Sequence, residues 1–274
     1  MSPEERANAY DAPCARCGGA VPAGAGLLRH GPRGWDVYHP GHAPAPGPPP
    51  PGDHPGWHRR RLLSLDIAST GNRPDWDRIT AAAVRGSDGT ARDWVLDPGP
   101  GWPGTEGSPG PTSPARALEE LTALLADHLA SRELLVVWYA PHVLTTLHAE
   151  LVRHGLAPLA DRLPGGVAPV CDPLVLDRHA DRYRPGGRSL PAVAAWYGVP
   201  LAHPGDPASD ARAALLVAEA VAAAYPAVAR LSRPALHTEQ VIWYAEQMER
   251  HPDAPAWPFE PVEPFDEPAG PSGG

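Results

Sequence analysis

Four side chains near the N-terminus have the types and the spacing of a metal site. Cys14 and Cys17 form a Cys-x-x-Cys pair, and His39 and His42 follow in the sequence His-Pro-Gly-His. Thiolate and imidazole are preferred zinc ligands, and four of them fill a tetrahedral site. Because so short a segment has almost no core, the metal would supply its folding energy. The pattern favours a structural zinc site over the alternative, an unstructured tail with two unrelated thiols.

A second group of candidate residues begins at the end of the apolar stretch RLLSLDI at 61–67. The segment from 65 to 71 reads LDIASTG. This stretch resembles the first motif of the DEDDh family of 3'-5' exonucleases, whose pattern is Asp-x-Glu-[Thr/Ser]-Thr-Gly. Asp66 matches the first carboxylate of that motif, and Ala68 stands where the family has its glutamate.

Two later stretches resemble the other motifs of the same family. LVVWYAPHV at 135–143 resembles the second motif, in which an aspartate begins a helix, but Val143 occupies that position. The third motif has a histidine five residues before Asp-Ala-Arg. The aspartate is present as Asp210, whereas Gly205 replaces the histidine and His203 lies two residues too early.

The resemblance implies a ribonuclease-H-like α/β fold, in which a mixed sheet of an antiparallel meander plus parallel strands is flanked by helices. It also implies two-metal nuclease chemistry, which needs several carboxylates and a general base. Of the family's four carboxylates the sequence retains two, Asp66 and Asp210, so we expect weak or no binding of magnesium or manganese. The favoured hypothesis is a pseudoenzyme that binds a single-stranded nucleic-acid end or a protein partner.

Two alternatives stay open at this point. The chain could be a divergent but active exonuclease on DNA or RNA that recruits substitute acids, for which the sequence offers Asp75, Asp77, Glu150 and Asp206. Alternatively, the zinc module could be the functional end, with the large domain as a scaffold for assembly.

The candidates for contact with nucleic acid are Thr70, Gly71, Tyr139, Arg182, Arg184 and Arg188. The three arginines surround a Pro-Gly-Gly loop and form the best local cationic cluster, while Tyr139 offers base stacking. The chain has no lysine and a net charge of -9. Phosphate neutralisation supplies most non-specific affinity, so we expect modest, salt-sensitive binding.

Hydrophobic periodicity predicts the elements that position these residues. Strands are expected at 61–67, 79–84, 92–97 and 133–138, and helices at 117–129, 143–154, 173–181, 189–197 and 208–224. The domain boundaries are expected at 1–42 for the zinc module, 43–58 for a Pro/Gly-rich linker, 59–231 for the exonuclease-like domain, and 232–274 for a C-terminal helix and Pro-rich acidic tail. A surface loop is expected at 98–114.

The cysteine content and the N-terminal sequence bear on the compartment. Two of the three cysteines form one Cys-x-x-Cys pair, which fits a reducing compartment better than a disulfide framework. The chain has no apolar run of about 18 residues, and its first residues lack the pattern of a signal peptide. We therefore expect a cytoplasmic protein without a membrane span, and Cys171 is expected to be a buried, inert thiol.

Overall fold

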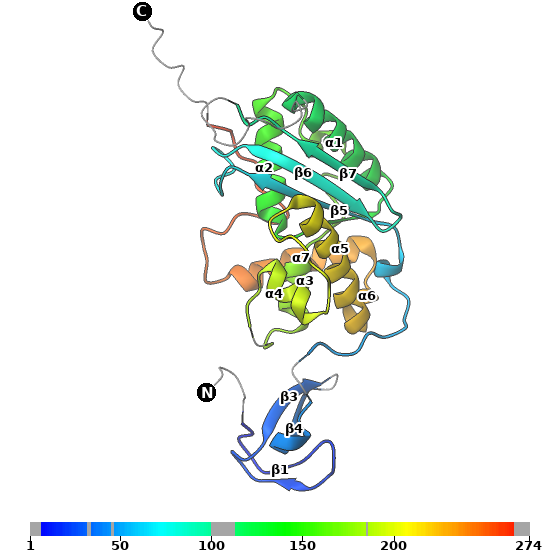
Figure 1. Cartoon of the computed structure of the whole chain (residues 1–274), viewed down its shortest axis with the longest axis vertical. Helices are drawn as coiled ribbons and strands as arrows, with labels where there is room; N and C mark the ends of the chain where they lie inside the picture. Colours follow the sequence, from blue (N-terminus) through cyan, green and yellow to red (C-terminus); the bar gives the residue numbers. More distant parts are fainter. Residues whose placement is uncertain (1–6, 32–33, 45–46, 100–112, 185, 266–274) are drawn as a thin grey trace, which may run out of the picture.

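The computed structural model describes residues 7–31, 34–44, 47–99, 113–184 and 186–265, and its largest element is a five-stranded mixed sheet (Figure 1). β5 (Leu62–Ser69), β6 (Ile79–Gly86) and β7 (Ala91–Val95) form an antiparallel meander. β8 (Leu134–Val137) and β9 (Val170–Cys171) extend the sheet parallel to β5, giving the order β7-β6-β5-β8-β9. The expected fold class is confirmed.

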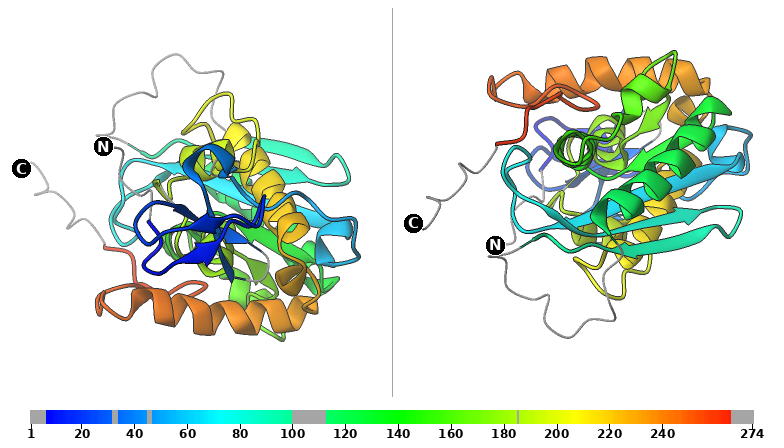
Figure 2. Two further views of the ribbon diagram at one scale, coloured as in Figure 1. Left: turned by 90° about the horizontal axis from the view of Figure 1, so that it is seen from below. Right: turned by 90° about the horizontal axis from the view of Figure 1, so that it is seen from above.

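Helices cover both faces of this sheet. α1 (Pro114–Ala130) lies on one face and contacts both β8 and α2 (Ala140–Arg153). α5 (Pro207–Ala224) crosses the other face, where its buried alanines allow close approach to β5 and β6 (Figure 2). α3 (Pro173–Ala180) and α4 (Leu190–Trp196) pack against α5, followed in the chain by α6 (Pro226–Ala229) and α7 (Arg233–Met248).

Two differences between the structure and the expected elements bear on the candidate site. The strand β9 was not expected, because two residues are too few to show a period of two. Helix α2 begins at Ala140 rather than at 143, since the carboxylate of Asp172 accepts the N–H groups of Tyr139 and Ala140. Such a cap comes from a residue distant in sequence, so the local pattern cannot show it. The expected buried state of Cys171 is confirmed.

The N-terminal module is built from four short strands that lie apart from the main sheet (Figure 1). β1 (Ala12–Pro13) pairs with β2 (Ala20–Val21), and β3 (Leu27–Gly31) pairs with β4 (Gly34–Tyr38), all antiparallel. Apolar side chains alone give this module little core, because Cys14 and Val21 are its buried hydrophobic residues among those described. Trp35 of β4 contacts Tyr183 of the main domain, with ring centroids 6.0 Å apart.

The second half of the expected linker lies against the main domain. The N–H of Gly52 donates to the carbonyl of Ala223 at 2.8 Å. The indole N–H of Trp57 donates to the carbonyl of Val228 at 3.1 Å, and its ring belongs to the main core. The packing of the large domain therefore includes residues before the expected start at 59. Most of the expected loop at 98–114 lies outside the described residues.

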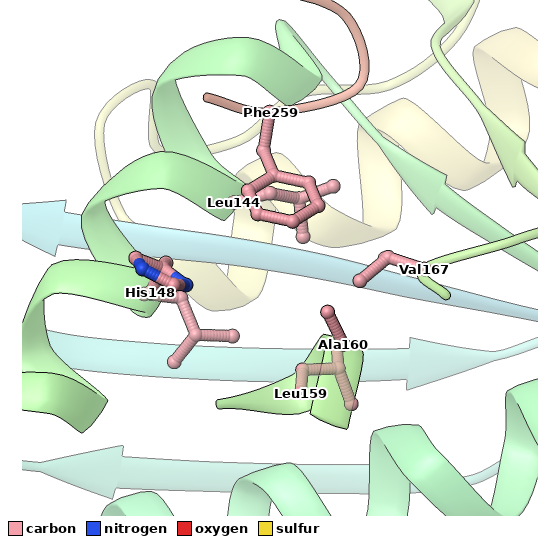
Figure 3. Close-up of a pocket in the computed structure, with 7 residues that line it drawn as sticks. Leu144, His148, Leu159, Ala160, Val167 and Phe259 are labelled. Carbon is pink, nitrogen blue, oxygen red and sulfur yellow. The ribbon is translucent and has the colours of Figure 1, made fainter. Parts of the chain in front are cut away.

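The C-terminal tail after α7 has no helix or strand within the described residues, and it packs on the main domain as far as Phe265. Trp257 is buried in the core, and Phe259 covers a small apolar pocket beside α2, where Leu144 and His148 lie (Figure 3). Further on, the backbone N–H of Phe265 donates to the carbonyl of Asp75 at 2.7 Å. Before these contacts, tail residues 252–255 line a cleft that Asp66 of β5 also lines.

Candidate nucleic-acid site and metal centre

Asp66 lies near the C-terminal end of β5 and lines an open cleft of about 850 Å³. The side chain is partly buried. Burial first, and then the negative charges of Asp210 and Asp206, raise the pKa of Asp66 from its ordinary 3.8 to about 8. Asp66 is therefore mainly protonated at neutral pH while no cation is bound beside it.

Two further carboxylates near Asp66, those of Asp206 and Asp210, come from the start of α5. Asp206 caps the helix by accepting the N–H of Ser209 at 2.9 Å. Asp210 accepts the N–H of Gly205 at 2.9 Å through Oδ2, while its Oδ1 is buried without a hydrogen-bond partner. Burial raises the pKa of Asp210, and the charge of Asp206 adds to this effect although the Gly205 N–H opposes it. An unpartnered carboxylate oxygen next to other acids fits a cation.

These acids nevertheless do not form a closed set of ligands. In the part of the chain that the structure describes, the candidate ligand atoms of Asp66, Asp206 and Asp210 do not converge within one coordination sphere. Magnesium gives up its waters reluctantly and needs near-ideal octahedral oxygen ligands. The residues present fit a weak cation site better than a pair of metal ions.

The three positions at which the sequence departs from the motifs it resembles lie in different surroundings. Ala68 is two residues after Asp66 on β5, so both point to one face of the sheet. Val143 belongs to the apolar core and lines the same cleft as Asp66. Gly205 has φ +90, which a side-chain-bearing residue rarely adopts. His203 is exposed, and its backbone N–H donates to Ser209 Oγ at 3.1 Å.

Three of the substitute acids considered from the sequence are engaged elsewhere. Glu150 is buried and ion-paired with Arg78 and Arg153. Asp77 accepts hydrogen bonds from Thr70 and from the backbone of Arg73. Asp75 pairs with Arg73 at 2.9 Å, and that hydrogen bond lowers the pKa of Asp75. Asp206 is the fourth of these acids, and its charge acts on both Asp66 and Asp210.

Tyr139 presents an aromatic ring to the cleft, with 40% of the residue exposed. Its backbone is left-handed, with φ 54, and its ring stacks on His142 at 6.1 Å. Asp172 holds this conformation, because its carboxylate accepts the N–H groups of Tyr139 at 3.1 Å, Ala140 at 2.9 Å and Leu174 at 3.0 Å. Burial raises the pKa of Asp172 to about 6 although those hydrogen bonds lower it.

Sequence reasoning missed Asp172, although an aspartate directly before Pro173 is a recognisable start of a helix. What the sequence could not show is that the same carboxylate also binds the first N–H groups of α2. Tyr244 was missed as well. It comes from α7, lines the cleft, and its hydroxyl is buried without a hydrogen-bond partner.

The expected arginine cluster is divided by the fold. Arg184 is buried, and its guanidinium pairs with the fully buried Asp177 at 3.0 Å. Arg188 also pairs with Asp177, at 2.5 Å. Because an isolated buried carboxylate is very unfavourable, these two arginines neutralise Asp177, and Arg184 is not available to phosphate. Arg182 is exposed, and its guanidinium lies 5.9 Å from the ring centroid of Tyr183.

Thr70 and Gly71 form the turn that follows β5. The hydroxyl of Thr70 donates to Asp77 at 2.9 Å and accepts the N–H of Arg78 at 3.0 Å. A Cβ on Gly71 would lie 2.6 Å from the carboxylate oxygens of Asp77, so a side chain does not fit there. In this structure both residues therefore serve the turn.

The four N-terminal candidates come together as a compact cluster. The ligand atoms of Cys14, Cys17, His39 and His42 all lie within 4.8 Å of one another. The Sγ of Cys14 lies 3.6 Å from Nδ1 of His42, and the Sγ of Cys17 lies 3.6 Å from Nδ1 of His39. Tetrahedral zinc with ordinary bond lengths places sulfur and nitrogen about 3.6 Å apart. The cluster could therefore hold zinc.

Neighbouring groups prepare this cluster for a metal. Burial raises the pKa of the Cys14 thiol, but hydrogen bonds from the backbone of His39 and the ring of His42 outweigh this and lower it to about 5. The Nε2 of His39 lies 3.2 Å from the carbonyl of Ala20, which can only accept, so the ring presents Nδ1 to the cluster. A thiolate and an oriented imidazole are what zinc ligation requires.

The structure is similar to solved structures of exonuclease I. One, described as suggesting how processivity is achieved, aligns with a TM-score of 0.52 and 16% identity, over 62% of this chain and 42% of that one. Escherichia coli exonuclease I bound to a dT13 oligonucleotide gives 0.51 and 16%, with the same coverage. The zinc-bound form of its complex with single-stranded DNA gives the same values.

The chain covers less than half the length of these proteins, and at this identity the likeness shows the fold alone. No protein-family model matches the sequence, and no curated protein matches it either. Among the described helices, none has the length and apolar character needed to cross a bilayer.

Proposed function

We propose that the chain is a DEDDh-like protein that binds a single-stranded nucleic-acid end in the cleft beside Asp66 but has largely lost two-metal hydrolysis. The observation that carries this proposal is the acid set at the cleft. Ala68 and Val143 replace two carboxylates, and Gly205 replaces the general base. Losing a general base alone typically costs about 10²- to 10⁴-fold in rate.

The electrostatics of Asp66 support the same conclusion. A carboxyl with a pKa of about 8 is a poor ligand for magnesium at neutral pH, because the ion must first displace the proton. In contrast, the aromatic wall of Tyr139 and His142 keeps a surface on which a base can stack. The protein would thus still bind nucleic acid although it no longer hydrolyses it. Such a protein would act in the cytoplasm.

We also propose an organisation into a zinc-folded module at 1–42, a linker at 43–58, the exonuclease-like domain at 59–231 and a C-terminal helix with its tail at 232–274. The zinc would be structural, since four protein ligands leave no open position. The tail contacts made by Trp257 and Phe259 support a role for the last segment in holding the large domain.

An end-labelled single-stranded oligonucleotide tests the function directly. We expect the wild-type protein to bind it, measured by fluorescence anisotropy, while leaving its length unchanged on a denaturing gel with magnesium or manganese. Asp66→Ala and a control at an exposed aspartate of α1, Asp127→Ala, should behave like the wild type on that gel. Metal-dependent shortening that Asp66→Ala abolishes and Asp127→Ala does not would refute the loss of chemistry.

A second candidate function is a divergent, active exonuclease that uses Asp206 as a third carboxylate. The observation in its favour is that the charge of Asp206 raises the pKa values of both Asp66 and Asp210. This candidate predicts that Asp206→Asn lowers a measurable metal-dependent activity. Asparagine still caps α5, so the helix is preserved in that variant.

A further inference from the structure

A groove between α3 and α7 continues the cleft away from Asp66. Its volume is about 500 Å³. Cleft and groove share four lining residues, namely Arg178, Met248, Arg250 and His251. A ligand that leaves the cleft on this side therefore enters the groove directly.

The groove is rich in arginine in a chain whose net charge is -9. Four arginines line it, and of these Arg188 is paired with Asp177. Arg178, Arg182 and Arg250 make no ion pair with any residue that the structure describes. Two glutamates of the α7 end, Glu246 and Glu249, also line the groove. Since guanidinium groups bind phosphate oxygens in pairs, three unpaired arginines suit successive phosphates.

Aromatic rings accompany the arginines along the same path. His179 and Trp243 stack within the groove, with centroids 3.7 Å apart and planes 11° apart. Where the groove meets the cleft, Tyr244 is 6% exposed and its hydroxyl has no hydrogen-bond partner. A buried hydroxyl without a partner costs free energy unless a ligand completes it. Cations interleaved with rings are typical of surfaces that bind single strands.

We propose that the groove between α3 and α7 binds the backbone of a single-stranded nucleic acid, with Arg178, Arg182 and Arg250 contacting its phosphates, while the strand's end occupies the cleft. This inference rests on the proposed function, because the strand must begin in that cleft. An acidic peptide would also pair with arginines. It would not account for the continuity with the stacked rings of Tyr139 and His142, which offer a face to a base.

The test compares two triple variants that remove the same charge. Arg178, Arg182 and Arg250 are changed to Gln in the groove variant. Arg92, Arg132 and Arg230 are changed to Gln in the control, because they are exposed and lie on other elements. Binding of a labelled oligothymidylate of about 16 nucleotides is followed by anisotropy over a range of salt, without magnesium or manganese.

Each phosphate contact on a single strand contributes about 0.7 to the slope of log affinity against log salt. The loss of three contacts should therefore reduce the magnitude of that slope by about 2. Over a fourfold rise in salt, the wild type should therefore lose roughly 20-fold more affinity than the groove variant. The control should keep the wild-type slope. Arg182→Gln alone, at an exposed position where folding is unaffected, should reduce the slope by about 0.7.

Equal slopes for the groove variant, the control and the wild type would overturn the inference while leaving the proposed function intact. No binding by the wild type would overturn both. The inference about the groove would also be overturned if the groove variant lost affinity for a glutamate-rich peptide and kept its affinity for the oligothymidylate. The arginines would then serve a protein partner.

Discussion

Replacing Asp66 with asparagine should make the protein more stable at mildly alkaline pH. The carboxyl of Asp66 is partly buried and faces the negative charges of Asp210 and Asp206, so its pKa is about 8 in the folded protein. In the unfolded chain the same group has its ordinary pKa of 3.8. Asparagine has nearly the same shape and cannot ionise. The variant therefore removes the unfavourable charge and keeps the packing.

The size and sign of the effect follow from proton linkage. Between pH 3.8 and about 8 the folded protein holds a proton that the unfolded chain releases, so the free energy of unfolding falls as pH rises through this window and stays low above it. At about 1.4 kcal/mol per pKa unit, the full difference corresponds to about 6 kcal/mol as an upper limit. Because the cleft admits water, which screens part of the charge, we expect about 2–3 kcal/mol at pH values near 8.

Urea unfolding at several pH values between about 3.5 and 9, in buffer without magnesium or manganese, measures this effect. Wild-type stability should fall with rising pH more steeply than that of Asp66→Asn, and the two curves should meet at the acidic end. Asp127→Asn, at an exposed site on α1, serves as the control and should follow the wild type. If Asp66→Asn instead follows the wild type at every pH, the carboxyl has an ordinary pKa and the argument for weak metal binding fails.

Two further predictions concern the module and the base-stacking surface. Cys14→Ser should reduce the zinc content from one ion per chain to almost none, measured by elemental analysis, while the thermal transition of the main domain stays unchanged; retained zinc would contradict the cluster as the binding site. Asp172→Ala should destabilise the chain by about 3–6 kcal/mol in urea unfolding, because the buried N–H groups of Ala140 and Leu174 lose their acceptor at roughly 1–3 kcal/mol each and the partly buried N–H of Tyr139 loses less. Asp172→Asn keeps one acceptor oxygen and should cost less, so equal losses in both variants would argue against this role.

The sequence was sufficient for the elements with a clear local pattern. The strands β5 to β7 follow from short apolar stretches separated by turn residues, and the helix α1 follows from leucines three and four residues apart. The strand β9 could not be found, because its two residues are defined by pairing with β8 alone. The start of α2 was placed too late for a similar reason, since its cap comes from Asp172 in another segment.

The candidate site likewise has residues that local sequence could indicate and residues that only the packing brings together. The types and the spacing of Cys14, Cys17, His39 and His42 were enough to predict one cluster. Each pair is close in sequence, so a single short loop brings its two ligands together. The role of Arg184 depends on the carboxylate with which it pairs inside the fold, which is that of Asp177. Nothing in the sequence around these two residues indicates that both are buried. Arg178 and Arg250 lie on different elements, so only the packing of α3 against α7 brings them to one groove.

The three positions at which the sequence departs from the motifs it resembles have different surroundings in the fold. Ala68 lies partly exposed on β5, just before the point where the pairing of β5 with β6 shifts register. At Val143 an acid would be placed in the apolar wall of the cleft, where its charge is unfavourable until a cation binds. Gly205 is different in kind, because its φ of +90 suits glycine and its N–H already binds Asp210. A histidine at that point would strain the loop and disturb the retained aspartate together. Under the proposed function, a histidine base at position 205 would therefore require a different backbone before α5, whereas acids at positions 68 and 143 would add metal ligands without adding that base.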